Sequence, residues 1–482
     1  MDCISEHTTK VLEIFKEITK IPRPSHKENK IRKFLLEFAN KNGLKSFEDE
    51  TGNVFIWSRY ESNQKSVILQ AHMDMVCEKK EGFEIDFEKD EIPYEIEGDY
   101  MISKSTTLGA DNGIGMAMIL AALIDKENET PIEAIFTVNE EDGMTGASKL
   151  ESSKFKSKTL INLDSAEESR AFGGCAGSKR LNVKFKKEFQ SLDDSYICYH
   201  LIISGLQGGH SGEDIHLNLG NALVILARAL YKFNDKFDIK VIDIYGGSKT
   251  NAIPRGAVAK IAIPKDLKIQ AQNLIVNINH DFVKELGIED PDVRINFEGA
   301  DFSDKALKDD LAERIIDYLY LAPNGVLGLS KMKGALVESS CNLAIVESDE
   351  KEIIIHSSIR SSKSTMIENL TLKHQIMSKL LGAQYQEEFS YPAWEFNYDS
   401  EIACIAKKVY EDLYGSELEV TIVHAGLEPV LICKSFEDLD IISIGPNIEH
   451  LHAPGEKVSI SSTNRTYRFL INILKEFSRR NK

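Results

Sequence analysis

Short apolar segments that alternate with an apolar helix constrain the fold of this chain more than any other feature. Residues 66–70, 132–138 and 159–163 are mainly apolar, which is typical of strands buried on both faces. Residues 114–124 follow a Gly-rich turn and form a helix of the same character. Such alternation predicts an α/β fold, with a sheet covered by helices.

The chain contains 482 residues, too many for one hydrophobic core, and we therefore expect two domains. Residues 9–20 predict a helix, and Ser25 is expected to cap a second helix that ends at Ala39. After residue 177 the pattern changes to polar–apolar alternation, as in half-exposed antiparallel strands. The sequence predicts a first domain of residues 1–184 and 391–482, interrupted by an inserted α+β domain of residues 185–390.

Composition excludes several classes of partner. The net charge of −18, without a basic stripe, argues against a nucleic-acid partner. The longest apolar stretch is about half of the ~20 residues that cross a bilayer, so we expect no membrane association. The seven cysteines are scattered without a Cys-x-x-Cys pair, which fits reduced thiols. We expect a soluble, cytoplasmic protein.

Two adjacent carboxylates, Glu140 and Glu141, follow the apolar segment that ends at Val138. If the strand continues that far, their side chains point to opposite faces and cannot share one role. One could bind a metal ion while the other moves protons. A solvated strand end is the alternative interpretation, because charged residues are rarely buried.

Single His and Asp residues follow other predicted strands and turns. His72 follows the strand at 66–70, and Asp74 lies two residues further on the same side of an extended chain. A metal-bound imidazole commonly donates its other N–H to a carboxylate, a role that Asp74 could fill. Asp111 lies in a Gly-rich turn and Asp164 ends a strand. Taken alone, His72 is more typical of a surface histidine and Asp111 of a helix cap or turn residue, and Asp164 could be a plain turn residue.

Near the C-terminus, His450 and His452 offer one further imidazole ligand. Imidazoles combined with carboxylates suit zinc or manganese and do not form a thiolate site. In a two-metal site one carboxylate bridges the ions, and a further carboxylate that is not a ligand transfers the proton.

Several motifs occur in an order that resembles the co-catalytic zinc exopeptidases, the family that contains the aminoacyl-histidine dipeptidases. The resemblance extends from about Ile21 to Glu456. It is carried by His72-Met73-Asp74, Leu108–Gly113, Asn139-Glu140-Glu141, Asn162–Ser165 and His452–Glu456, and supported by Gly174–Gly177, Gly208–Gly212, Asn251–Arg255 and His424–Glu428. It implies a phosphorylase/hydrolase-like catalytic domain with a mixed sheet and an inserted lid domain.

The resemblance also implies roles for individual residues. Two divalent cations are expected, zinc first and manganese or cobalt as alternatives. The implied ligands are His72 and Asp164 for one ion, Glu141 and His452 for the other, and Asp111 as the bridge. The trailing Ala-Pro-Gly-Glu favours His452; ligation by His450 would offset the site by two residues. Glu140 is implied as the general base and Asp74 as the group that orients His72.

The inserted domain is implied to complete the site. His210 resembles the histidine that polarises the scissile carbonyl, supplied by domain closure or by a second subunit. Asn251 and Arg360 resemble residues that hold the substrate backbone and its carboxylate, and Gly426 would line the substrate cleft. A homodimer formed through the inserted domain is expected.

The resulting hypothesis is a metal-dependent dipeptidase of short peptides, with Xaa-His dipeptides such as carnosine as preferred substrates. A broader dipeptidase, a tripeptidase or an N-acyl amino-acid deacylase would use the same ligands. A silent metal- or peptide-binding protein is disfavoured because Glu140 and every ligand position are filled. A phosphate-binding protein is disfavoured because the Gly-rich turns lack a Gly-Lys-Ser/Thr signature.

Overall fold

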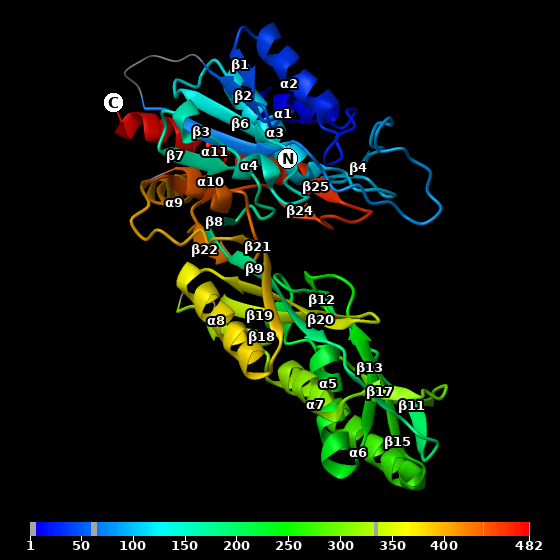
Figure 1. Cartoon of the computed structure of the whole chain (residues 1–482). Helices are drawn as coiled ribbons and strands as arrows, with labels where there is room; N and C mark the ends of the chain where they lie inside the picture. The colour runs from blue at the N-terminus through cyan, green and yellow to red at the C-terminus, as the bar shows by residue number, and fades with distance from the viewer. Residues whose placement is uncertain (1–5, 59–64, 332–335, 437, 482) are drawn as a thin grey trace. The chain divides into compact units, whose positions relative to one another are not determined.

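The computed structural model describes residues 6–58, 65–331, 336–436 and 438–481 (Figure 1). The chain forms two compact units. The first contains residues 1–175, 394–423 and 427–482, and the second contains residues 176–393 and 424–426. Within the described ranges, no helix is long and apolar enough to cross a membrane. The six described cysteines are free thiols, while Cys3 lies outside the described residues.

A mixed sheet organises the first unit and confirms the α/β class. Its eight strands follow the order β1-β2-β6-β3-β7-β23-β8-β22. The four central strands, β6 to β23, run parallel to one another, so their carboxyl ends lie at one edge. The strand bounds are β1 Lys45–Glu48, β2 Val54–Trp57, β3 Val67–His72, β6 Ile132–Thr137, β7 Thr159–Asn162, β8 Arg170–Cys175, β22 Glu419–Val423 and β23 Asp440–Ser443.

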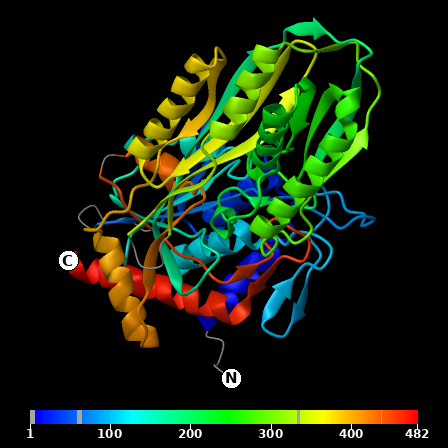
Figure 2. The ribbon, with the colours of Figure 1, turned by 90° about the horizontal axis from the view of Figure 1, so that it is seen from below.

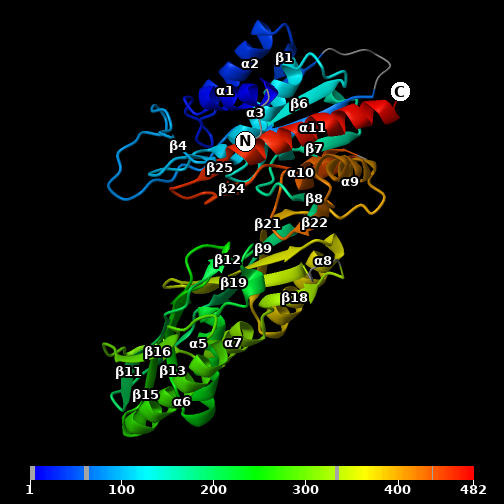
Figure 3. The same ribbon diagram turned by 180° about the vertical axis from the view of Figure 1, so that it is seen from behind.

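Helices cover this sheet because their apolar residues need burial. Helix α3 (Ala110–Ile124) is buried almost all round, since it packs on β3 and is covered by α1 (Glu6–Ile18). Helix α11 (Ile460–Arg480) packs against α9 (Glu401–Tyr414), as Figures 2 and 3 show. The short helices α4 (Thr145–Ser148) and α10 (Pro429–Ser435) contact each other.

Helix α2 departs from the sequence expectation at its start. It spans Asn29–Lys41, and Glu28 precedes it without a side-chain cap. The Ser25 hydroxyl instead donates to Oδ2 of Asp74 at 2.8 Å. The predicted Ser25 cap is therefore wrong, because a distant carboxylate takes that hydroxyl.

A small sheet fixes the segment near the C-terminus. Its order is β24-β25-β5-β4, with bounds Ile448–Glu449, Lys457–Ser459, Tyr100–Ile102 and Glu95–Glu97. The pairing of β25 with β5 ties residues 457–459 to residues 100–102. This attachment holds the loop that contains His452.

The second unit is an antiparallel sheet with helices. The sheet order is β16-β11-β15-β13-β19-β20-β9-β21, and β18 pairs with β19. Strand β9 starts at Gly177 and pairs with β20 and β21, so this unit begins before residue 185. The other strands are β11 Tyr196–Ser204, β13 Lys240–Gly246, β15 Ala257–Pro264, β16 Arg294–Gly299, β18 Gly325–Leu329, β19 Val337–Ser348, β20 Glu352–Ser361 and β21 Gln384–Tyr391, and the long helices are α5 Ala222–Lys236, α6 Lys268–Leu286, α7 Asp309–Leu321 and α8 Ser364–Leu380.

Candidate metal centre

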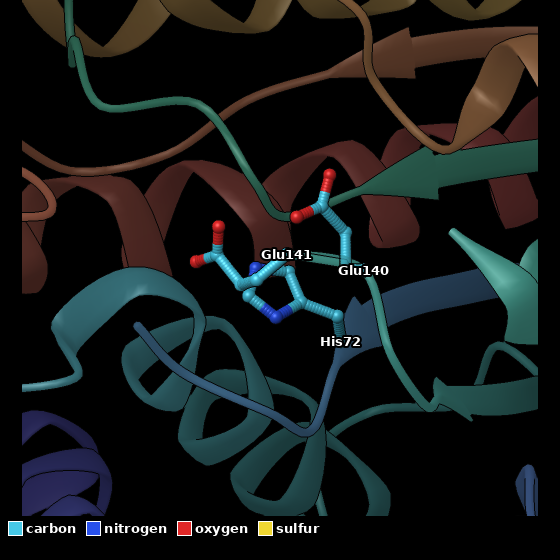
Figure 4. A group of neighbouring side chains, drawn as sticks. All are labelled: His72, Glu140 and Glu141. Atoms are coloured by element: carbon cyan, nitrogen blue, oxygen red, sulfur yellow. The ribbon is translucent and has the colours of Figure 1, made fainter. Parts of the chain in front are cut away.

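The carboxyl ends of the parallel strands bring the candidate ligands together. His72 is the last residue of β3, and Asp164 lies two residues after β7. Strand β6 ends at Thr137, and Asn139 has a positive φ, so Glu140 and Glu141 lie in a turn rather than on a continued strand. Open α/β sheets bind ligands at this edge. In Figure 4 the two glutamate side chains diverge from one backbone segment near the His72 ring.

One group of possible ligands contains His72, Asp111 and Asp164. Nε2 of His72 lies 2.9 Å from Oδ1 of Asp111 and 3.4 Å from Oδ1 of Asp164. The His72 side chain is only 1% exposed, so its polar atoms need partners inside the protein. These three side chains present nitrogen and oxygen atoms toward one point.

A second group contains Asp111, Glu141 and His452. Nε2 of His452 lies 3.2 Å from Oδ2 of Asp111 and 3.3 Å from Oε2 of Glu141. The two oxygens of Asp111 thus face two different histidines. His450 is exposed and belongs to none of the ligand groups found among the described residues.

Electrostatics at this edge favour positive charge. Hydrogen bonds to Asp111 and Glu141 raise the pKa of His452 to about 11. Burial opposes the charged form of His72, yet Asp164 and Asp111 still raise its pKa well above the ordinary value. A cluster that stabilises imidazolium this strongly also suits divalent cations, since buried charges are either paired or coordinate metals.

Glu140 lies in a different environment from Glu141. Burial, followed by the neighbouring Glu141 carboxylate, raises the pKa of Glu140 well above that of an ordinary glutamate. Together with His72 and Glu141 it forms the third group of possible ligands. Its elevated pKa suits a group that accepts and returns a proton.

Asp74 connects the histidine to the glutamate pair. Nδ1 of His72 lies 3.1 Å from the backbone oxygen of Asp74 and 3.5 Å from its Oδ1. The Asp74 carboxylate also accepts the backbone N–H groups of Glu140 and Glu141, at 2.9 and 3.1 Å. Asp74 therefore contacts both His72 and the backbone of the glutamate pair.

Two buried charged residues, to which the sequence analysis gave no role, hold the turn that contains Asp111. The Glu456 carboxylate accepts the backbone N–H groups of residues 108–111, at 2.7 to 3.2 Å. The Arg23 guanidinium donates to the backbone oxygens of Met73, Asp74 and Gly109. Gly109 has a φ of +69° and lies against that guanidinium, which leaves no room for a side chain. The Glu after Ala-Pro-Gly was the available sequence signal for Glu456; Arg23 gave none beyond a helix break.

The remaining candidate residues belong to the second unit. His210 is the register partner of Ala252, the residue after Asn251. Nδ1 of His210 accepts the backbone N–H of Glu213 at 3.1 Å, so the neutral form of this ring has its proton on Nε2. Gly212 packs between this ring and the backbone oxygen of His424. A side chain at position 212 would not fit, because its Cβ would lie 3.1 Å from Cε1 of His210 and 2.8 Å from that oxygen.

Arg360 lies on β20 opposite Ser340 of β19, and its side chain is buried. The Ser340 hydroxyl and Nε2 of His424 are 2.7 Å apart. Burial, followed by the charge of Arg360, lowers the pKa of His424 to about 3. Arg360 therefore lies near the 424–426 loop, which contains Gly426.

A parallel-stranded edge that holds two three-ligand groups joined by one aspartate is the arrangement of a metallohydrolase centre. The family model of peptidase family M20/M25/M40 matches residues 68–476. The chain belongs to this family.

Individual relatives agree with this assignment. The cytosol non-specific dipeptidase of Escherichia coli (strain K12) is 34% identical over 470 residues, 96% of each chain. The crystal structure of aminoacylhistidine dipeptidase from Vibrio alginolyticus matches with a TM-score of 0.87 and 34% identity, over 98% of both chains. Human carnosine dipeptidase 1, at 12% identity and a TM-score of 0.53 over 99% of this chain and 97% of its own, shares the fold.

Proposed function

We propose that this chain, a dipeptidase of peptidase family M20/M25/M40, binds two divalent cations and hydrolyses short peptides with Glu140 as the general base. The observation that carries this proposal is the position of Asp111. Its Oδ1 faces His72 and its Oδ2 faces His452, and it is shared by two ligand groups. A carboxylate with this geometry can bridge two ions.

The donor set fits zinc. Two imidazoles and three carboxylates make up the two groups, and no cysteine belongs to them among the described residues. His72, Asp111 and Asp164 would hold one ion, and Asp111, Glu141 and His452 the other. Manganese or cobalt would accept the same nitrogen and oxygen donors, so they are the alternatives.

Metal ions bound here would lower the pKa of a water molecule and polarise the scissile carbonyl. Glu140 takes the proton from the attacking water and returns it to the leaving amine. Asp74 keeps Glu140 in place through the backbone N–H that it accepts. The raised pKa of Glu140 suits both halves of this transfer.

The second unit is proposed as a lid that supplies the remaining polar groups. His210 carries its proton on Nε2, as a donor to a developing oxyanion must. Arg360 would bind the substrate carboxylate, Asn251 would hold the substrate backbone and Gly426 would line the cleft. We also propose that this unit forms a homodimer, which size-exclusion chromatography with light scattering would detect as twice the chain mass.

Xaa-His dipeptides, including carnosine, are the proposed substrates, and a broader dipeptidase specificity is the second candidate. Each has support from a relative at 34% identity, one named for aminoacylhistidine and the other non-specific. Tripeptidase or deacylase activity would need the same centre. The acidic chain is proposed to act in the cytoplasm, without nucleic-acid or membrane partners.

A metal-reconstituted assay tests this function. Apoprotein would be loaded with Zn²⁺, Mn²⁺ or Co²⁺ and offered carnosine, other Xaa-His dipeptides, dipeptides without histidine, tripeptides and N-acetyl amino acids. Release of histidine from the Xaa-His peptides supports the specific assignment, and equal turnover of all dipeptides supports the broader one. Absence of peptide hydrolysis with every metal would contradict the proposed function.

A further inference from the structure

A row of buried polar side chains crosses the four central strands of the sheet in the first unit. In sheet order, the strands contribute Thr137 from β6, Gln70 from β3, Asn162 from β7 and Ser443 from β23. Register pairs Gln70 with Asn162, and Asn162 with Ser443. All four side chains are completely buried. Buried polar groups in a sheet are costly unless each has a partner, and each side chain of this row has one.

The row ends on the Glu428 carboxyl, which is also completely buried. Ser443 donates to Asn162, and Asn162 donates to Oε1 of Gln70 at 2.6 Å. Gln70 and Thr137 then donate to the same oxygen of Glu428, Oε2, at 2.5 and 2.6 Å. Glu428 therefore joins β3 to β6 at their carboxyl ends.

These contacts lie next to the residues of the proposed reaction. Alternate side chains of a strand share a face, so Gln70 and His72 project from the same side of β3. Thr137 is the last residue of β6 and precedes Glu140 by three positions. A shift of either donor would displace His72 or the turn that contains Glu140.

We propose that Glu428 is a positioning residue for the dipeptidase reaction, which fixes His72 and Glu140 through Gln70 and Thr137. This inference rests on the proposed function of the same centre. Groups that orient metal ligands and catalytic residues typically contribute about 10–100-fold in activity or metal affinity. Glu428 needs only one of its oxygens for this role, since Oε1 has no hydrogen-bond partner among the described residues.

That asymmetry permits a sharp comparison of two variants. In Glu428→Gln the amide oxygen can accept from Gln70 and Thr137, while the amide nitrogen takes the place of Oε1. Burial raises the pKa of Glu428 to about 8, and the neutral amide resembles the protonated carboxyl. In Glu428→Leu, Gln70 and Thr137 lose their short hydrogen bonds to the carboxyl at similar side-chain volume. Only the longer contacts remain, from Gln70 to the Thr137 hydroxyl at 3.2 Å and from Thr137 to the backbone oxygen of Ala71 at 3.4 Å.

Three measurements decide the proposal: kcat and KM at full metal loading, Zn²⁺ affinity by calorimetry, and thermal unfolding. We expect Glu428→Leu to lower kcat about 10–100-fold, with little change in KM and with weaker Zn²⁺ binding. Glu428→Gln should restore kcat to within about threefold of the unmodified enzyme. If Glu428→Leu does not fold, Thr137→Val removes one donor at nearly constant volume and should lower kcat in the same direction.

Ser443→Ala is the matched control at the far end of the row. It removes one buried hydrogen bond, should lower the temperature of thermal unfolding and should leave kcat unchanged. Unchanged kcat and Zn²⁺ affinity in Glu428→Leu would overturn the proposal, and so would equal losses in the Leu and Gln variants. If the unmodified enzyme hydrolyses no peptide, that result contradicts the proposed function instead. In that case the comparison of Zn²⁺ affinities by itself tests whether Glu428 positions His72.

Discussion

The carboxylate of Glu456 offers the most quantitative test of how the centre is held. Glu456 is 2% exposed and accepts four backbone N–H groups: Oε2 accepts those of Leu108 and Gly109, and Oε1 those of Ala110 and Asp111. In Glu456→Gln one oxygen remains, so two of the four N–H groups face an amide nitrogen that cannot accept. Each unsatisfied buried donor costs about 1–3 kcal/mol, which gives about 2–6 kcal/mol for two.

The loss of stability in Glu456→Gln should affect residues 108–111 before the rest of the protein, because the four N–H groups belong to the turn that leads into Asp111. Amide hydrogen exchange of residues 108–111 would measure it, and we expect exchange in the Gln variant to accelerate by at least about tenfold. Zn²⁺ affinity should fall with it. Glu449→Gln is the control, since Glu449 is 45% exposed and pairs with Lys457 at the surface. Unchanged exchange at residues 108–111 would refute this account of the turn.

Further expectations concern single residues. Glu140→Gln should lower kcat about 10²–10⁴-fold, and metal analysis should still find both ions bound. Full activity of this variant would exclude Glu140 as the base. His452→Ala should lose one of two bound ions and His450→Ala neither; the reverse stoichiometry would identify His450 as the ligand. His374 is completely buried, with Tyr318 and Cys341 beside its ring, and burial lowers its pKa to about 4. The unfolded chain therefore binds this proton at higher pH than the folded chain, so the contribution of His374 to stability is complete above about pH 6.5 and lost as the pH falls toward 4. Relative to His374→Gln, the free energy of unfolding should decrease by about 3 kcal/mol from pH 7 to pH 4, and parallel curves for the two proteins would contradict this.

The sequence predicted the strand ends well because the signal there is local. Apolar segments that end at Gln70 and Val138, just before His72 and Glu140, marked two ends of parallel strands, and such ends meet at one edge. The distinction between His450 and His452 needed a family motif, since both lie in one polar loop and both have positive φ values.

Interactions between distant segments could not be predicted. Ser25 looked like a helix cap, yet its hydroxyl bonds a carboxylate 49 positions away. Glu428 reaches Gln70 across 358 positions and Glu456 reaches Leu108 across 348. Local patterns carry no information about such pairs, because only the folded sheet and its turns bring them together.

Anomalous diffraction from crystals of the zinc-loaded protein tests the central claim most directly. We expect two zinc peaks, with His72 and Asp164 at about 2.0–2.2 Å from one and Glu141 and His452 at that distance from the other. One oxygen of Asp111 should contact each ion, and Glu140 should contact neither. A single peak, or a zinc ion bound directly by Glu140, would contradict the account.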